Sequence, residues 1–576
     1  MSAIIELAQR LRRQLLTVVE RYRFTSAEKT FLRTYRVAKA RDADASPTVL
    51  VEAVEEQFYL ALFGCVIAGI AANRPVRVLQ FTTRSLRPGG TRSLYHAFKS
   101  MWFYNTLTDR KWIRLYSAFC DGVAFRSAQL SRGAWADLIQ ARRIWKSLES
   151  REALLELTVS GIKVGDLVYD TYLRFKPAAT VDLKSRYLWL VLWQTLRDLR
   201  AASEWMSRAK PFMLISTYST YIQHGVPVRA ALTAGIKVFT FGNYQEFYKQ
   251  LSMTDWTHTR NPDGYRSGFA ALEAPERSLA QADRALTSRL AGAIDTATAY
   301  MQRSAYQDRA DLPDGIAGSL VLFLHDFFDS PHCYRWMIFA DFWDWATFTL
   351  DLTRTAGIRA FVKPHPNEVS GSKSVVRQLK SQYPDVTWLS KNTSNVQLAE
   401  AGMGVAVTIY GTVAHELAYL GIPSIAAGHN PHISYSFCHT ARNRDEYAKL
   451  ILGYRDLPRS PAALRQESLE FYCMHNLAIT SEQLALRDVT TRFRTLEIAS
   501  RGNIRNAADF ITFKRDLDGQ PAFRQACKQM TRELGSSSSA GGSHGQDAFA
   551  DAAQRILAAG EQMADEACAR EQYPRR

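Results

Sequence analysis

The sequence predicts an α/β protein with two domains, each built on a parallel, doubly wound sheet, that face each other across a cleft. Short apolar segments alternate with helical patterns in both halves of the chain, first over 48–81 and again over 320–426. Regular alternation of strand and helix is typical of parallel sheets that carry helices on both faces. The 576 residues also exceed what a single domain usually contains.

The first half opens with a predicted strand–helix–strand unit. A buried strand over 48–51 ends at Glu52, an apolar helix follows over 58–72, and the next strand covers 77–81. The apolar helix is too short for a membrane span, which requires about 20 residues. We expect further strands at 213–217 and 237–242, after a mainly helical insertion over 91–208.

The second half gives the clearest strand pattern. Strands are expected at 320–324, 359–362, 386–389, 405–409 and 424–426, with helices between them. We therefore divide the chain into five parts: a basic helical N-terminal segment (1–45), a first α/β domain with a helical insertion (46–315), a second α/β domain (316–455), C-terminal helices (456–535), and a flexible linker with a tail helix (536–576).

The composition limits the expected classes of binding partner and the expected cellular compartment. The formal net charge of +16 favours anionic partners such as nucleic acid, an anionic membrane surface or a phosphorylated substrate. No nucleic-acid-binding module accompanies this charge, so we exclude nucleic acid. The seven cysteines are odd in number and form no CxxC pair, which argues against a disulfide framework and a zinc site and favours a reducing cytoplasm.

The N-terminal 40 residues show a basic, amphipathic helical pattern. Arg10, Arg12 and Arg13 interrupt its apolar residues, which excludes a secretory signal. We favour a helix that packs on the first domain, because apolar periodicity mainly reports a buried face. Peripheral attachment to the anionic inner face of the membrane stays open as the alternative for this cytoplasmic protein.

Four strand ends of the second half carry a histidine. The carboxyl ends of parallel strands meet at one edge of a sheet, and ligands of doubly wound sheets bind there. We therefore expect these loops to converge on one site. The residues concerned are His325, His365, His415 and His429, and Asn430 follows the last of them.

The turn Tyr410-Gly411-Thr412 has the features of a phosphate site. Gly411 allows a phosphate to approach the backbone closely, and Thr412 begins a helix whose free N–H groups favour an anion. Glu416 lies four residues later on the same helix face, where it can reach a ribose diol. The alternative interpretation is that Thr412 is an ordinary helix cap.

The segment from Lys363 to Pro366 is stiff because Pro364 and Pro366 fix their own φ angles and restrict the residues before them. This stiffness would hold His365 at the edge of the sheet beside Lys363. A rigid histidine next to a lysine suits the binding of a diphosphate or a nucleoside monophosphate.

Catalytic candidates lie in the loop after the first strand of the second half. His325 and Asp329 would face the cleft between the domains, and Asp329 could act as a base or as a nucleophile. Loop capping by Asp329 is the structural alternative. Asp341 is expected to orient this loop from a helix.

The first half offers fewer candidates. Glu52 and the loop at 244–247 each follow a strand and could meet an acceptor hydroxyl, although both could equally be solvated carboxylates. His224 with Arg229 could add a positive contact on the far wall of the cleft, and a plain helix start is the alternative.

Several of these motifs resemble blocks of bacterial capsule and surface-polysaccharide glycosyltransferases, over about 48–455. They are Lys363-Pro-His-Pro366, the turn from Gly411 to Glu416, Gly421-x-Pro423, the loop from His325 to Asp329, and the aromatic segment from Phe339 to Trp345. The resemblance implies the GT-B fold, with a Rossmann-like acceptor domain first and a Rossmann-like nucleotide-sugar domain second.

In the Kdo and sialic acid transferases that this chain resembles, an HP motif and a Ser/Thr turn bind the nucleotide. By that match His365, Pro366, Gly411 and Thr412 would contact it here. The resemblance therefore implies transfer of a sugar from a nucleotide donor, with a CMP-sugar such as CMP-Kdo favoured, to a growing surface polysaccharide or a lipid-linked glycan.

No metal and no cofactor besides the donor substrate is expected, because Lys363, His365 and the helix N-terminus can offset the charge of the leaving phosphate. The same two blocks also resemble UDP-sugar 2-epimerases and teichoic-acid polyol-phosphate transferases, so these activities stay open. A non-catalytic glycan assembly protein is the alternative from a different class.

Overall fold

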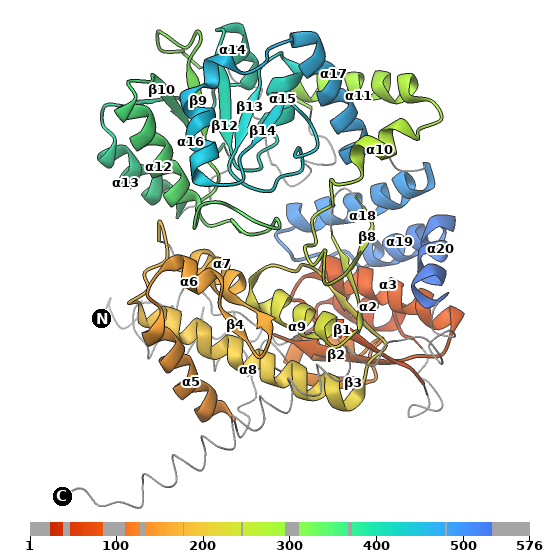
Figure 1. The fold of residues 1–576 in the computed structure, drawn as a ribbon. Coiled ribbons are helices and arrows are strands. Elements are labelled where there is room, and N and C mark those ends of the chain that lie inside the picture. Colours follow the sequence, from red (N-terminus) through yellow and green to blue (C-terminus); the bar gives the residue numbers. More distant parts are fainter. Residues whose placement is uncertain are drawn as a thin grey trace, which may run out of the picture.

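A computed structural model describes residues 23–37, 46–83, 110–126, 133–176, 178–242, 246–293, 310–366, 371–477 and 481–532. In that part of the chain, two lobes each surround a six-stranded sheet (Figure 1). None of the helices described there is both long and apolar enough to cross a membrane. Most of the predicted 1–45 segment and the predicted linker and tail at 536–576 lie outside the described residues.

The first sheet has the strand order β3-β2-β1-β6-β7-β8. Only β8 is antiparallel to its neighbour. The chain adds β2 and then β3 on one side of β1, and later adds β6, β7 and β8 on the other side. The topological switch point therefore lies between β1 and β6. The strands are β1 (Thr48–Glu52), β2 (Arg77–Thr82), β3 (Gly122–Arg126), β6 (Met213–Ser216), β7 (Lys237–Phe241) and β8 (Tyr248–Leu251).

Helices bury both faces of this sheet, which is why its central strands are almost continuously apolar. Leu50 of β1 enters one core, whereas its neighbours Val49 and Val51 enter the other. The first core includes residues of α5 (Ala134–Ser147), α6 (Arg151–Leu155), α7 (Gly165–Phe175), α8 (Arg186–Ala209) and α9 (Tyr221–Thr233). The second includes α2 (Ser26–Thr34), α3 (Gln57–Asn73), α18 (Ser481–Ala499), α19 (Ala507–Asp518) and α20 (Pro521–Thr531).

The second sheet repeats this topology with the order β11-β10-β9-β12-β13-β14, and all its strands are parallel. Its switch point therefore lies between β9 and β12. The strands are β9 (Leu320–Phe323), β10 (Ala360–Lys363), β11 (Thr387–Trp388), β12 (Val405–Thr408), β13 (Ser424–Ala426) and β14 (Cys438–Thr440).

Helices again cover both faces. One core includes α12 (Phe342–Thr355), α13 (Ser372–Gln382) and α16 (Arg444–Leu452), and the opposite core includes α14 (Asn395–Glu400) and α15 (Val413–Tyr419). A further cluster joins α15 to α10 (Tyr265–Ala270), α11 (Pro275–Leu290), α17 (Pro461–Tyr472) and the π-helical turn η4 (Cys473–Leu477). A short 3₁₀ turn, η3 (Tyr454–Asp456), follows α16. Two facing, doubly wound lobes confirm the predicted α/β, GT-B-like fold class.

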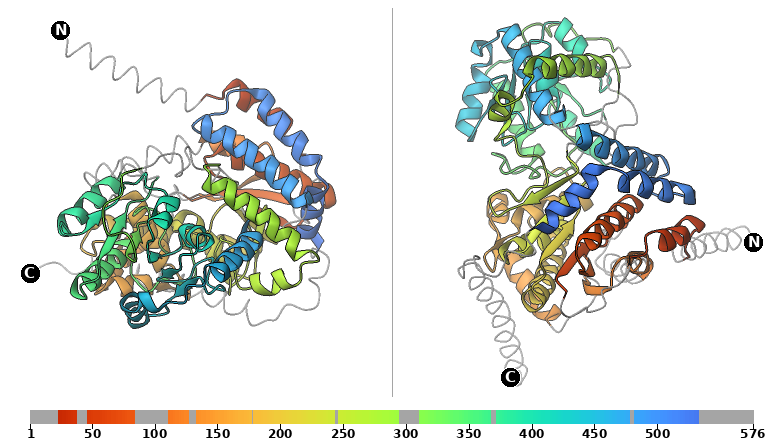
Figure 2. Two further views of the ribbon diagram at one scale, coloured as in Figure 1. Left: turned by 90° about the horizontal axis from the view of Figure 1, so that it is seen from above. Right: turned by 90° about the vertical axis from the view of Figure 1, so that its right-hand side faces the viewer.

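The chain passes between the lobes twice. Helices α10 and α11 precede residue 315 but pack with α17 in the second lobe, whereas α18, α19 and α20 return to cover α3 of the first lobe (Figure 2). The domain boundary at 315 stays a prediction. The packing of these helices depends on contacts between distant segments rather than on their order in the sequence.

The secondary-structure prediction missed several short or peripheral strands. The stretch 91–208 is mainly helical in its described residues, as predicted, but it also contains β3 and a hairpin of β4 (Thr158–Val159) and β5 (Ile162–Lys163). β8 and β14 were also missed. The edge strand β3 has only one buried residue, and β4, β5 and β14 are two or three residues long, so none of them produces the apolar run that reveals a central strand.

Candidate functional site

The candidate site lies at the switch point of the second sheet, where His325 follows β9 and Thr408 ends β12. The backbone N–H of Ile409 donates to His325 Nε2 at 3.2 Å, and the hydroxyl of Thr408 lies 3.1 Å from the same nitrogen. Because Nε2 accepts a backbone hydrogen bond, the neutral ring carries its proton on Nδ1. Burial and the nearby His365 lower the pKa of His325 to about 3, so the ring is neutral at pH 7.

The hydroxyl of Thr408 also holds the turn after β12. The N–H of Gly411 donates to Thr408 Oγ1 at 3.3 Å. A Cβ atom at Gly411 would lie 2.8 Å from that hydroxyl and 3.7 Å from His325 Cε1, so this position tolerates only glycine without displacement of its neighbours. Thr412 is exposed, and its side chain makes no capping hydrogen bond. The interpretation of Thr412 as an ordinary cap therefore does not describe this structure.

Lys363 is the last residue of β10 and is 5% exposed. Its ammonium lies 5.7 Å from the ring of Phe323, and within the described residues it makes no hydrogen bond or ion pair. Burial lowers the pKa of Lys363 to about 8, although Glu416 opposes this shift. A buried ammonium with so few contacts is unusual, because buried charges are normally paired.

His365 and Pro366 follow Lys363 and are half-buried. The electrostatic coupling of His365 to His325, together with the close approach of Gly411 to His325, places three of the predicted loops side by side. These loops come from β9, β10 and β12, so residues that are far apart in the sequence meet at one edge.

His429 follows β13 and is 5% exposed, and neither of its ring nitrogens has a hydrogen-bond partner in the described part of the chain. Burial and the nearby Arg335 lower its pKa to about 4, so the ring is neutral at pH 7. The rings of Tyr334 and Trp336 lie 6.1 and 6.2 Å from it, and Tyr334 in turn contacts Tyr410 at 5.0 Å.

Asn430 and Glu416 have their hydrogen-bonding capacity largely occupied. The Asn430 amide donates to Gly428 O at 3.0 Å and to Thr440 Oγ1 at 2.9 Å, which fixes the loop that carries His429. Glu416 Oε1 accepts from Arg289 at 2.7 and 2.9 Å, and Oε2 accepts from Asn395 at 2.6 Å. These bonds occupy three of the roughly four acceptor positions of the carboxylate, so Glu416 has little capacity left for a ribose.

The loop after β9 faces the first lobe. Arg174 of α7 donates to Phe328 O at 3.3 Å. Burial raises the pKa of Tyr221 in the first lobe, and the nearby Asp329, which is exposed, raises it further. Asp341 caps α12 and accepts a hydrogen bond from Tyr169 at 2.6 Å. Asp341 thus lies at the start of a helix, as predicted, but its carboxylate accepts from Tyr169 and Thr180 of the first lobe, so its role in orienting the loop stays a prediction.

A buried pair that the sequence did not reveal also joins the lobes. His332 Nδ1 lies 2.6 Å from Asp170 Oδ1, and the His332 N–H donates to Asp170 Oδ2 at 3.3 Å. Burial raises the pKa of Asp170 to about 6 against the opposing effect of His332. Burial lowers the pKa of His332, but Asp170 and the nearby carboxylates of Asp166 and Asp341 outweigh it, so the pKa is raised.

Glu52 lies at the switch point of the first sheet and is 3% exposed, so it is not a solvated carboxylate. It accepts from Ser216 Oγ at 2.7 Å and from the Thr217 N–H at 3.1 Å, and His224 Nδ1 lies 2.5 Å from its Oε1. Burial acts to raise the pKa of Glu52, but His224 and these hydrogen bonds outweigh it and lower the pKa.

Other first-lobe candidates have mixed outcomes. Arg229 is buried and binds Asp166 of its own lobe at 2.5 and 2.6 Å, so it stabilises this lobe instead of lining a cleft wall. Residues 244 and 245 of the predicted 244–247 loop lie outside the described part of the chain. Glu246 lies within it, and burial raises its pKa.

Comparisons with known proteins give only distant structural similarities. No family model matches the sequence, and no curated protein matches it. Among solved structures, the chain is similar to a putative UDP-N-acetylglucosamine 2-epimerase from Listeria monocytogenes, with 8% identity over 80% of this chain and 98% of the other and a TM-score of 0.21.

Two further structures are similar to the same extent. UDP-GlcNAc 2-epimerase from Neisseria meningitidis bound to UDP-GlcNAc has 9% identity over 79% of this chain and 99% of the other, with a TM-score of 0.23. Glycosyltransferase VinC in complex with dTDP has 11% identity over 77% and 99%, with a TM-score of 0.22. Because these TM-scores are low, the function has to be argued from the site itself.

Proposed function

We propose that the protein is a glycosyltransferase that binds a nucleotide sugar at the carboxyl edge of the second sheet. One observation carries this proposal: Lys363, at the end of β10, and His429, after β13, are each 5% exposed, make no hydrogen bond in the described part of the chain, and belong to the same edge of one sheet. Buried polar groups nearly always have partners. Two such groups at the edge where doubly wound sheets bind ligands indicate a site built for a ligand.

The chemistry of the edge fits a nucleotide diphosphate or monophosphate. The Lys363 ammonium would offset phosphate charge, and the Gly411 turn would allow phosphate oxygens to approach the backbone. The neutral His325 can donate from Nδ1, and the neutral His429 offers one donor and one acceptor for a base or a sugar hydroxyl. His365, Thr412 and Tyr410 complete the proposed wall.

We further propose distinct roles for the carboxylates. Glu52 already binds His224, Ser216 and Thr217, so it would position His224 and not touch substrate. Asp329 is exposed on the loop that faces the first lobe, and it is the carboxylate best suited to accept a proton from an acceptor hydroxyl. Replacement of Asp329 by Asn should reduce kcat strongly and leave nucleotide affinity unchanged.

The preferred donor is a CMP-sugar such as CMP-Kdo, and the preferred acceptor is a surface polysaccharide or a lipid-linked glycan. The resemblance of the Lys363-Pro-His-Pro366 block to that of the Kdo and sialic acid transferases supports this choice. Peripheral association with the inner membrane would follow from a lipid-linked acceptor and from the net charge of +16.

Thermal-shift measurements with CMP, UDP, GDP and CDP test the binding site, because a ligand that binds only the folded protein raises its melting temperature. The variants Lys363→Met and His429→Phe keep the size of the side chain but remove the unpaired groups. We expect both to keep or raise the melting temperature of the free protein and to lose the nucleotide-induced shift.

Lys449→Met provides the matched control, because Lys449 is exposed on α16 in the same lobe. His365→Ala and Thr412→Val should lose the shift as well. A full nucleotide-induced shift in both Lys363→Met and His429→Phe would refute the site.

Turnover assays then separate the alternative functions. Release of nucleotide together with a lengthened glycan identifies a transferase. Conversion of UDP-GlcNAc to its 2-epimer without net release of nucleotide would identify an epimerase instead, and turnover of a polyol-phosphate donor would identify a polyol-phosphate transferase. No turnover with any donor would leave a non-catalytic glycan assembly protein.

A further inference from the structure

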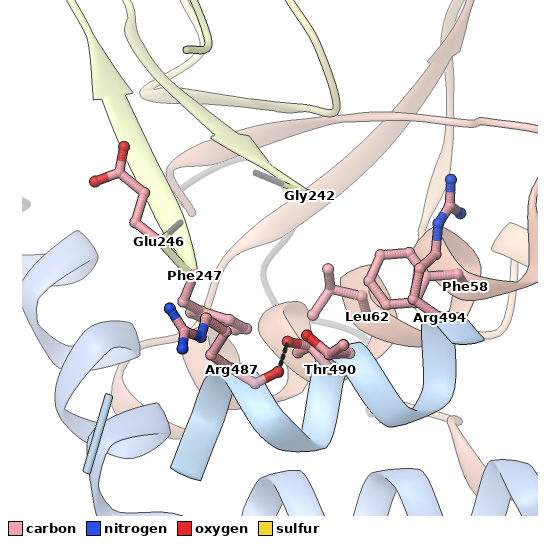
Figure 3. A pocket seen from close by; sticks show the side chains of 9 residues that line it. Phe58, Leu62, Gly242, Glu246, Phe247, Arg487, Thr490 and Arg494 are labelled. Carbon is pink, nitrogen blue, oxygen red and sulfur yellow. Dashed lines mark hydrogen bonds between the residues drawn. The ribbon is translucent and has the colours of Figure 1, made fainter. Parts of the chain in front are cut away.

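Two adjoining pockets form a groove along one side of α18, which we call the α18 groove. Figure 3 shows the first pocket, where Arg487, Thr490 and Arg494 of α18 lie opposite Phe247 and Phe58. The second pocket has a volume of about 420 Å³, within the range of small-molecule sites. The pockets adjoin, because Glu246, Phe247 and Arg487 line both.

The lining of the α18 groove follows one helix. It extends along α18 from Glu482 to Arg494, a rise of about 18 Å at 1.5 Å per residue. Its other walls come from α3, from α20, and from Gly242 and residues 246–248. The first pocket has a volume of only about 20 Å³, so a ligand would lie mainly in the second pocket.

The chemistry of the lining favours a polyhydroxylated chain. The amides of Gln525 and Gln529 provide donors and acceptors that match hydroxyl groups, and Gln529 Oε1 already accepts from the Tyr248 hydroxyl at 3.0 Å. Phe247 and Tyr248 add flat apolar surface that can pack against a sugar ring. In the larger pocket two arginines, Arg260 and Arg487, oppose two glutamates, Glu246 and Glu482, so the wall has no dominant charge to select a phosphate.

The floor of the groove is anchored at the junction of the lobes. Arg260 donates to Met474 O at 2.7 Å and to His475 O at 3.0 Å, and Arg487 donates to Asn476 O at 2.8 Å. These bonds fix α18 and the β8 side of the groove to η4 of the second lobe. A ligand would thus meet preformed walls, which lowers the entropic cost of binding.

The groove also opens at the edge of the first sheet that faces the second lobe. Gly242 follows the last residue of β7; the adjacent parallel strand β6 ends at Ser216, and β1, the next strand beyond it, ends at Glu52 on the same edge. We propose that the α18 groove binds the oligosaccharide chain of the acceptor, an inference that rests on the proposed transferase function. Its occupant is an oligosaccharide and not the nucleotide.

The test places a bulky side chain in the groove without touching the nucleotide edge. Gln525 is exposed on α20 and lines the groove, so Gln525→Trp should fill it and leave the fold intact. Lys528 is exposed on the same helix outside the lining, and Lys528→Trp is the matched control. The probes are a dextran hexasaccharide and a hexamer of α2,8-linked sialic acid, measured by calorimetry with the full-length protein.

We expect at least one probe to bind the parent protein and the Lys528→Trp variant equally, and to bind the Gln525→Trp variant about tenfold more weakly. Equal affinity in both variants, or no binding of either probe to the parent, would overturn the proposal. The thermal shift with nucleotides should be the same in all three proteins. Loss of nucleotide binding in the parent with intact saccharide binding would refute the transferase and retain the groove.

Discussion

Replacement of Glu416 by Gln should destabilise the second lobe, because this carboxylate is part of a buried ion pair. The side chains of Glu416 and Arg289 are only 4% and 5% exposed, and Arg289 contacts Oε1 with two nitrogens at 2.7 and 2.9 Å. The substitution keeps the shape of the side chain but leaves the Arg289 guanidinium buried without its counter-charge. Such a change costs about 3–5 kcal/mol.

Hydrogen exchange is the appropriate assay, because a chain with two lobes need not unfold in one step. A loss of about 3–5 kcal/mol corresponds to exchange that is faster by about two to four powers of ten in the amides of β12 and α15. Asp385→Asn is the control: Asp385 pairs with Arg354 at the surface, with side chains 56% and 44% exposed, and its exchange should not change measurably.

The same variant decides between two roles for Glu416. If the carboxylate holds a ribose diol, Glu416→Gln should lose nucleotide affinity and keep the exchange rates of the parent. If the carboxylate anchors α15, as its bonds to Arg289 and Asn395 indicate, the amides of β12 and α15 should lose their protection against hydrogen exchange. Exchange no faster than in Asp385→Asn would refute the anchoring role.

Three further outcomes are expected. The pKa values of Asp170, at about 6, and of His332 are both raised, so the joined pair binds more protons than the separated side chains. The lobes should therefore separate more easily as the pH rises from about 4 to about 6, where Asp170 loses its proton, and again above about 6.5 through the raised pKa of His332; small-angle scattering of the parent that is identical at all pH values would contradict this. Gly242→Ala should lower the melting temperature by the equivalent of about 1–3 kcal/mol, because φ is +95° and the new Cβ would meet the Tyr59 hydroxyl. Trp345→Ala should lower the free energy of unfolding, measured by chemical denaturation, by about 3–5 kcal/mol, because Trp345 is fully buried. A smaller decrease would mean that the core of the second lobe collapses into the cavity.

The central strands of both sheets could be predicted because burial on both faces leaves a continuous apolar run. The strands β9, β12 and β13 lie within or at the predicted segments for this reason. Once these strands are placed, the edge position of His325 and Gly411 follows from parallel topology alone, and the contacts of His325 with Thr408 and Ile409 agree with it.

The partners of the site residues could not be predicted in the same way. The sequence suggests that Glu416 contacts a ligand. Its actual partner, Arg289, lies 127 residues earlier and reaches Glu416 only because α11 packs in the second lobe. Asp170 and His332, 162 residues apart, meet only when the lobes do. Such pairs depend on how helices and lobes are arranged, and a single sequence contains no periodic signal for them.

The double passage of the chain between the lobes makes the second lobe an insertion within the first. Its entry and exit are fastened together where Arg260 binds the carbonyls of Met474 and His475. Adjacent ends of this kind allow a module to be cut out or grafted with little disturbance of its host. A gene split at residue 315, in contrast, would strip α18, α19 and α20 from the apolar face that contains Phe63 and Ile67, and the resulting fragment should aggregate.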